Sequence, residues 1–108
     1  FQEKNWDYPE AVDHLNAAVL QRFPDLAAGC TRRRVHAALS IRRLLVHADA
    51  ASAQDIARCE SIIHAGAKVV LGDRRAPLRD KAGILLTRAG RRVFDCAWGL
   101  YERIRRNY

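Results

Sequence analysis

Two groups of basic side chains give this sequence its clearest chemical signal. A guanidinium group presents five N–H donors in a planar fork, so arginine binds the oxygens of a phosphate or a carboxylate in pairs. Apolar side chains beside it can enter the boundary between the headgroups and acyl chains of a bilayer. The residues of the two groups and their apolar neighbours are Arg32, Arg33, Arg34, Arg74, Arg75, Arg79, Lys81, Leu26 and Phe23. We predict that they bind an anionic partner.

The charge is distributed unevenly along the chain. The 108 residues carry a net charge of +7. Residues 1–30 contain two basic and five acidic side chains, a net charge of −3, so the remaining residues carry +10. Such asymmetry favours an anionic partner: a membrane headgroup, a nucleic acid or an acidic protein. A solvated surface that keeps the domain soluble is the alternative interpretation.

The sequence contains no pattern typical of catalysis or metal binding. Its four histidines are spread over three predicted helices without an HxxxH spacing, and no CxxC pair occurs. The glycine patterns of nucleotide-binding loops are also missing. We therefore predict a non-enzymatic domain with no cofactor and no metal. Cys30, Cys59 and Cys96, odd in number and widely spaced, are interpreted as free thiols in a reducing compartment, with Cys59 buried and Cys96 partly buried.

The first predicted helix spans residues 9–22. Asp7 can cap it, Pro9 fits its first turn, and Pro24 disfavours its continuation. Residues 1–8 are predicted to be a loose lead-in to this helix.

The second predicted helix has Thr31 as its N-cap and is closed by residues 49–51. This start places Arg32–Arg34 in the first turn, where each cation would oppose the helix dipole by roughly 0.3 kcal/mol. The other interpretation is that the helix begins earlier and the arginines lie inside it.

The third predicted helix begins after Ser52, which resembles the first residue of a capping box with Asp55. Gly72 is a suitable C-terminal cap. A narrow apolar seam follows steps of three and four residues through Ile56, Cys59, Ile63, Gly66 and Val70. On this seam, Gly66 either lets a neighbouring helix approach closely or weakens its own helix by about 1 kcal/mol.

The longest predicted helix spans Pro77–Arg106, and the other helices are expected to pack against it. Its apolar stripe consists of Leu78, Ala82, Leu85, Ala89, Val93, Ala97, Leu100 and Ile104. Trp98 and Tyr101, three residues apart, share a face that packs against the first helix or forms a contact in a homodimer.

These elements predict a single all-α domain over residues 1–108. Short connections favour an antiparallel up-down four-helix bundle with a long C-terminal helix. In that topology the first and third connections lie at the same end. The two basic groups would therefore meet on one tip of the bundle.

In length, helical layout and the mixture of Leu26 with Arg32–Arg34, Arg74, Arg75 and Arg79 on one tip, the chain resembles a known family. These are the BteA-like four-helix-bundle membrane-localisation domains, or lipid-raft-targeting domains, of bacterial toxins and type III secreted effectors. The resemblance implies binding to anionic phospholipid, phosphoinositide included. It also implies a domain excised from a larger protein, peripheral to a host membrane after delivery.

A nucleic acid is the alternative partner, and a cytoplasmic location goes with it. Positive charge continues along the last predicted helix through Arg88, Arg91, Arg92, Arg103, Arg105 and Arg106. Residues 85–91 also resemble the wing-to-helix junction of winged-helix regulators. The apolar stripe favours a helix over a hairpin at this position.

Overall fold

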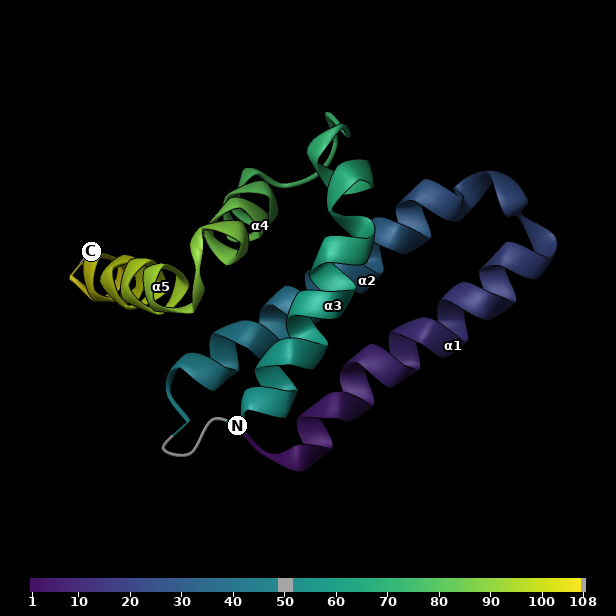
Figure 1. The fold of residues 1–108 in the computed structure, drawn as a ribbon. Coiled ribbons are helices and arrows are strands. Elements are labelled where there is room, and N and C mark those ends of the chain that lie inside the picture. The colour runs from purple at the N-terminus through teal and green to yellow at the C-terminus, as the bar shows by residue number, and fades with distance from the viewer. Residues whose placement is uncertain (49–51, 108) are drawn as a thin grey trace.

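The computed structural model of the protein describes residues 1–48 and 52–107, and every regular element in these ranges is helical (Figure 1). Two short 3-10 helices, η1 and η2, accompany five α-helices. The elements are η1 (Glu3–Trp6), α1 (Asp7–Arg22), η2 (Pro24–Leu26), α2 (Ala27–Val46), α3 (Ala53–Leu71), α4 (Leu78–Ala89) and α5 (Arg91–Arg106). The predicted all-α class is therefore confirmed.

The N-terminal residues are anchored, not loose as predicted. Trp6 is buried, its indole N–H donates to Asp55 Oδ1 at 3.2 Å, and the Arg58 guanidinium lies 3.9 Å from the ring centroid. Asp7 is the first residue of α1 rather than its cap. These contacts attach the start of α1 to the first turns of α3.

The second helix starts four residues before Thr31, so the earlier of the two predicted starts is correct. Pro24–Leu26 form η2, and α2 begins directly after it at Ala27. Arg32–Arg34 consequently lie in the second turn, beyond the first N–H groups of the helix. The structure ends α2 at Val46, and the predicted closing residues 49–51 lie outside the described ranges.

The third helix begins as predicted, and its seam packs closely on α2. Ser52 Oγ accepts a hydrogen bond from the Gln54 backbone N–H at 3.1 Å. A Cβ atom at Gly66 would lie 2.4 Å from Val35 Cγ2 and 2.9 Å from Thr31 Cγ2. The prediction that Gly66 permits a close helix approach is confirmed.

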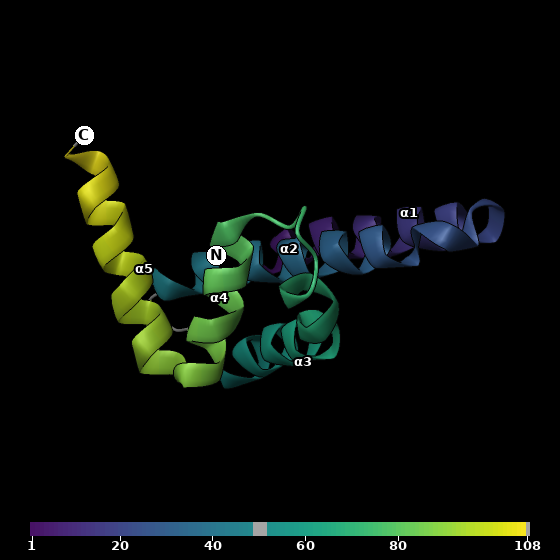
Figure 2. The ribbon, with the colours of Figure 1, turned by 90° about the horizontal axis from the view of Figure 1, so that it is seen from above.

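The predicted long C-terminal helix is wrong, because it is divided at Gly90. This glycine has φ 133° and ψ 161°, a conformation that is essentially restricted to glycine, and α5 starts in a new direction after it. Figure 2 shows α5 steeply inclined to α2, so the C-terminal helices do not complete a parallel-sided bundle of four.

The predicted apolar stripe does not form the buried face of these helices. Leu78, Leu85, Val93, Leu100 and Ile104 are all exposed. The buried positions of α4 and α5 lie between them in sequence: Asp80, Gly83, Ile84, Thr87 and Phe94. A change of helix direction at Gly90 breaks the alignment on which one continuous face depends.

Helix α2 forms the centre of the core, burying eight residues against the other helices. One of them is Arg42, which is 1% exposed. Its guanidinium lies 4.4 Å from the Phe94 ring centroid, and its Nη2 is 2.8 Å from Asp95 Oδ1. Since that carboxylate atom has no aligned hydrogen bond, the interaction is a charge contact. It attaches α5 to the core.

Candidate anion-binding site

A charge contact brings the start of α2 beside the connection between α3 and α4. Arg32 Nε lies 2.9 Å from Asp73 Oδ2, and the other carboxylate oxygen of Asp73 accepts from the Arg75 backbone N–H at 2.8 Å. Two basic groups separated by some forty residues in sequence therefore approach each other. One arginine at this junction is already paired with an acid.

The remaining basic side chains differ in their exposure to solvent and in whether an acidic side chain lies against them. Arg33, Arg74, Arg75 and Arg79 are exposed, and Lys81 is half-buried. Arg34 Nε lies 3.1 Å from Asp13 Oδ1, so α1 partly neutralises the arginine triplet.

Leu78 is the most exposed large apolar side chain in the described part of the chain, at 82%. It is the first residue of α4 and lies next to Arg79 in sequence. The sequence pattern assigned Leu78 to the apolar stripe as well as to the predicted tip, and Leu78 was not among the residues predicted to bind the anionic partner. Leu78 directly follows Pro77 and is therefore the first residue of the helix, and this position in the sequence indicated that it could be exposed.

Phe23 and Leu26 are exposed. The prediction that they lie beside Arg74 and Arg75 is wrong. They belong to the turn between α1 and α2, which extends beyond the end of α3 (Figure 1). α2 has 20 residues and α3 has 19, so the separation comes from where the α1–α2 turn lies and not from helix length. The two basic groups of the predicted tip therefore meet at Arg32 and Asp73, whereas its apolar residues Phe23 and Leu26 lie elsewhere.

An open groove of about 310 Å³ runs between α2 and the start of α4. Arg32, Arg33 and His36 line one side, and Pro77 and Asp80 line the other. The first N–H groups of α4 have no side-chain cap, so the positive end of its dipole opens here. Arg32, Arg33 and this dipole create an environment that favours an anion.

Asp80 is the one acidic side chain that lines this groove, and it is buried. Its carboxylate lies 2.9 and 3.1 Å from His36 Nδ1, and Arg43 Nη2 is 3.7 Å from Oδ1. Neither partner was recognised in the sequence, because the contact joins α2 to α4 across 44 residues. Asp80 is therefore paired with His36 and Arg43, and its negative charge does not neutralise the exposed arginines.

The cysteines differ in environment. Burial raises the pKa of Cys59 to about 12, so its thiol is protonated and unreactive. Cys30 is also buried, whereas Cys96 is exposed, contrary to the prediction. In residues 1–48 and 52–107 no three His, Cys, Asp or Glu side chains are close enough to share a metal ion.

The surface suggested for nucleic acid is divided between two helices. Arg88 belongs to α4, and Arg92, Arg103, Arg105 and Arg106 are exposed on α5. Arg91 is held by Glu60 of α3 through a hydrogen bond of 2.7 Å. Residues 85–91 contain the end of α4 and the turn into α5, not the strands that a winged helix requires.

Comparisons with protein-family models, with curated proteins and with solved structures found no match to this chain. None of the helices in the described ranges is long and apolar enough to span a bilayer.

Proposed function

We propose that this domain docks on anionic phospholipid membranes through the junction of α2 with the α3–α4 connection. The observation that carries the proposal is Leu78, 82% exposed and bordered by arginines. We call this surface the basic junction, and it consists of Arg32, Arg33, Arg74, Arg75, Leu78 and Arg79. An isolated exposed leucine needs no explanation, but one with Arg75 and Arg79 close to it in sequence fits a bilayer surface.

The energies are of the right order for a reversible peripheral attachment. A basic residue close to an anionic leaflet contributes about 1 kcal/mol. Arg33, Arg74, Arg75 and Arg79 count toward this sum, whereas Arg32 is discounted because Asp73 occupies it. Transfer of Leu78 into the interfacial region adds a smaller apolar contribution. The resemblance to effector membrane-localisation domains supports the same proposal, including phosphoinositide as a ligand and a larger parent protein that the domain carries to a host membrane.

The test is co-sedimentation with vesicles of phosphatidylcholine alone, and of phosphatidylcholine containing phosphatidylserine or a phosphoinositide. We expect binding only to the anionic vesicles, decreasing as salt is raised. The double variant Arg33→Glu with Arg75→Glu should abolish it. Arg103→Glu with Arg105→Glu changes the net charge equally on α5 and should retain most of the binding.

Leu78→Asn separates insertion from electrostatic attraction. This position is exposed, so the variant should fold normally yet release from vesicles at a lower salt concentration. Equal binding to neutral vesicles, or equal losses in the two double variants, would contradict the proposal. A mobility shift with random DNA or RNA at physiological salt, without vesicle binding, would make nucleic acid the partner instead.

A further inference from the structure

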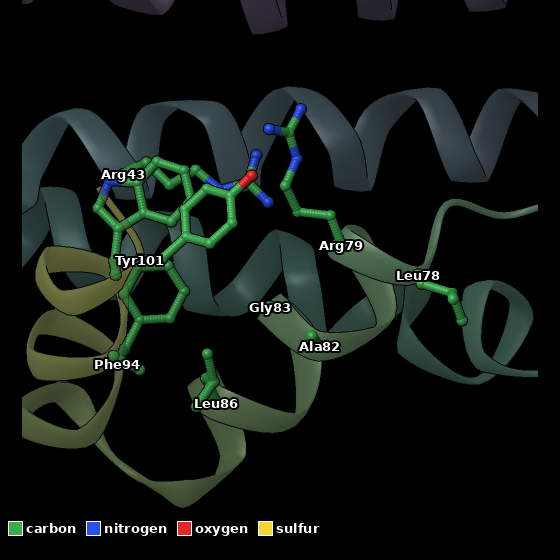
Figure 3. A pocket seen from close by; sticks show the side chains of 10 residues that line it. Arg43, Leu78, Arg79, Ala82, Gly83, Leu86, Phe94 and Tyr101 are labelled. Atoms are coloured by element: carbon green, nitrogen blue, oxygen red, sulfur yellow. The ribbon is translucent and has the colours of Figure 1, made fainter. Parts of the chain in front are cut away.

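Helices α4 and α5 line a partly open apolar cavity of about 340 Å³ at their interface (Figure 3). This volume is within the range of small-molecule sites, roughly 300–1,000 Å³. Ten side chains line the cavity, and only Arg43, Arg79 and Tyr101 among them place a polar group at the end of a long side chain.

Small residues on both helices leave this space open. α4 contributes Ala82 and Gly83, and α5 contributes Ala97 between the larger rings of Phe94 and Trp98. A Cβ atom at Gly83 would lie 3.0 Å from Leu39 Cδ2, so the same glycine also allows α4 to approach α2. The backbones are thus held close to the core while the side chains fail to fill the gap between the helices.

Polar groups gather at one end of the cavity. In Figure 3 the Arg79 guanidinium and the Tyr101 hydroxyl point toward the end where Arg43 lies, away from Leu86 and Phe94. The Arg43 side chain is only 10% exposed, and its guanidinium lies 4.9 Å from the Trp98 ring centroid. Burial and the positive charge of Arg79 both lower the pKa of Arg43, while Asp80 opposes this shift.

The charge at that end is not balanced within the described structure. Asp80 is the acid nearest to Arg43, at 3.7 Å, and it makes shorter contacts with His36. The carboxylate of Asp80 is therefore mainly engaged with His36, and the positive charge of Arg79 also acts on Arg43. An added anion would relieve the repulsion between Arg43 and Arg79, and it would be bound in a partly desolvated place where charge-assisted hydrogen bonds are strong.

We propose that this cavity binds a single-chain carboxylate amphiphile, with its carboxylate between Arg43 and Arg79 and its alkyl chain between α4 and α5. A carboxylate matches the planar fork of arginine, and the rest of the lining is apolar. This ligand is a free, monomeric molecule, so the proposal does not depend on docking to a membrane surface. It assigns a second, partly open site that shares Leu78 and Arg79 with the basic junction.

The test is isothermal titration calorimetry with decanoate, kept below the concentration at which it forms micelles. We expect one decanoate per chain. Decanol, decyltrimethylammonium and acetate should each bind at least tenfold more weakly, because each lacks either the anion or the chain. Equal heats for decanoate and decyltrimethylammonium, or no binding of decanoate, would overturn the proposal.

Matched variants on α4 locate the ligand. Ala82→Phe places a ring in the cavity and should abolish decanoate binding, whereas Ala89→Phe, on the same helix outside the lining, should not. Arg79→Gln should weaken binding about tenfold, and Arg88→Gln should leave it unchanged. Circular dichroism verifies that all four remain folded. Binding that survives in Ala82→Phe overturns the assignment, as does an equal loss in Ala89→Phe.

A different occupant would give a different pattern. If an apolar side chain of a partner protein fills the cavity, decanol should bind as tightly as decanoate and Arg79→Gln should have no effect. That result would reject a carboxylate ligand. The decanoate titration contains no vesicles. A negative result in it would therefore reject the carboxylate site without contradicting the proposal of membrane docking.

Discussion

The α2–α3 pair and the α4–α5 pair differ in how closely their facing surfaces pack. At Gly66 the first pair is so close that a single added methyl group would overlap Val35. The second pair lines a partly open cavity of about 340 Å³. α2 buries eight of its residues, whereas α5 buries only Phe94. One pair is close-packed, and the other presents apolar side chains to the outside.

The difference shows where stability and binding are concentrated in this fold. Close packing around Cys59 and Val35 leaves only a small surface pocket of about 120 Å³ beside Gly66. The α4–α5 region has a cavity, exposed leucines and several exposed arginines. Both proposed sites therefore involve α4, which is attached to the core through Ile84 and Asp80 but has an open face.

The largest expected contrast is in thiol reactivity. In native protein at pH 8, iodoacetamide should modify Cys96 at least about a thousandfold faster than Cys59, because Cys59 reacts only after an opening of the core. Mass spectrometry of timed samples measures both rates. Comparable rates would mean that α2 and α3 open readily, which would remove the distinction between the two regions.

Replacing Arg42 tests the attachment of the open region to the packed one. Arg42→Ala leaves a void beside Phe94 and removes the buried partner of Asp95, so we expect a loss of about 3 kcal/mol in the free energy of unfolding. Urea denaturation measures it. Arg88→Ala, on the surface of α4, should change stability by less than about 0.5 kcal/mol. A similarly small effect for Arg42→Ala would show that α5 is not held by this contact.

Adding one methyl group to the packed interface should be the next largest effect. Gly66→Ala places a Cβ atom 2.4 Å from Val35 Cγ2, and we expect a destabilisation of about 2 kcal/mol despite the better helix propensity of alanine. The double variant with Val35→Ala should recover part of the loss in the same urea experiment. No recovery would mean that the helices do not meet at this point.

Two glycines of the open region should respond less, and in opposite directions. Gly90→Ala must adopt φ near 133° or realign α5, at a cost of about 1–2 kcal/mol. Gly99→Ala has no atom within 4 Å of the new Cβ and should stabilise the protein by up to about 1 kcal/mol. Thermal unfolding followed by circular dichroism compares them. A stabilised Gly90→Ala would support the single long helix that the sequence predicts.

The failed prediction of that long helix identifies a limit of periodicity arguments. Apolar residues at steps of three and four correctly indicate helix on both sides of Gly90. They do not show which residues face the core, because Leu85, Val93 and Leu100 are exposed whereas Ile84 and Phe94 are buried. A glycine directly after the last turn of a helical pattern is a common C-terminal signal, and it should have divided the element.

The amino-acid sequence by itself determined the helical class, the end of the first helix at Pro24 and the cap at Ser52, and it offered the close approach at Gly66 as one of two alternatives. These features depend on backbone preferences and spacings within one or two turns. Only the tertiary structure decided that Arg32 meets Asp73, that Phe23 lies away from Arg75, and that α4 and α5 line a cavity. Each of those depends on the relative positions and directions of helices distant in sequence, which no local pattern specifies.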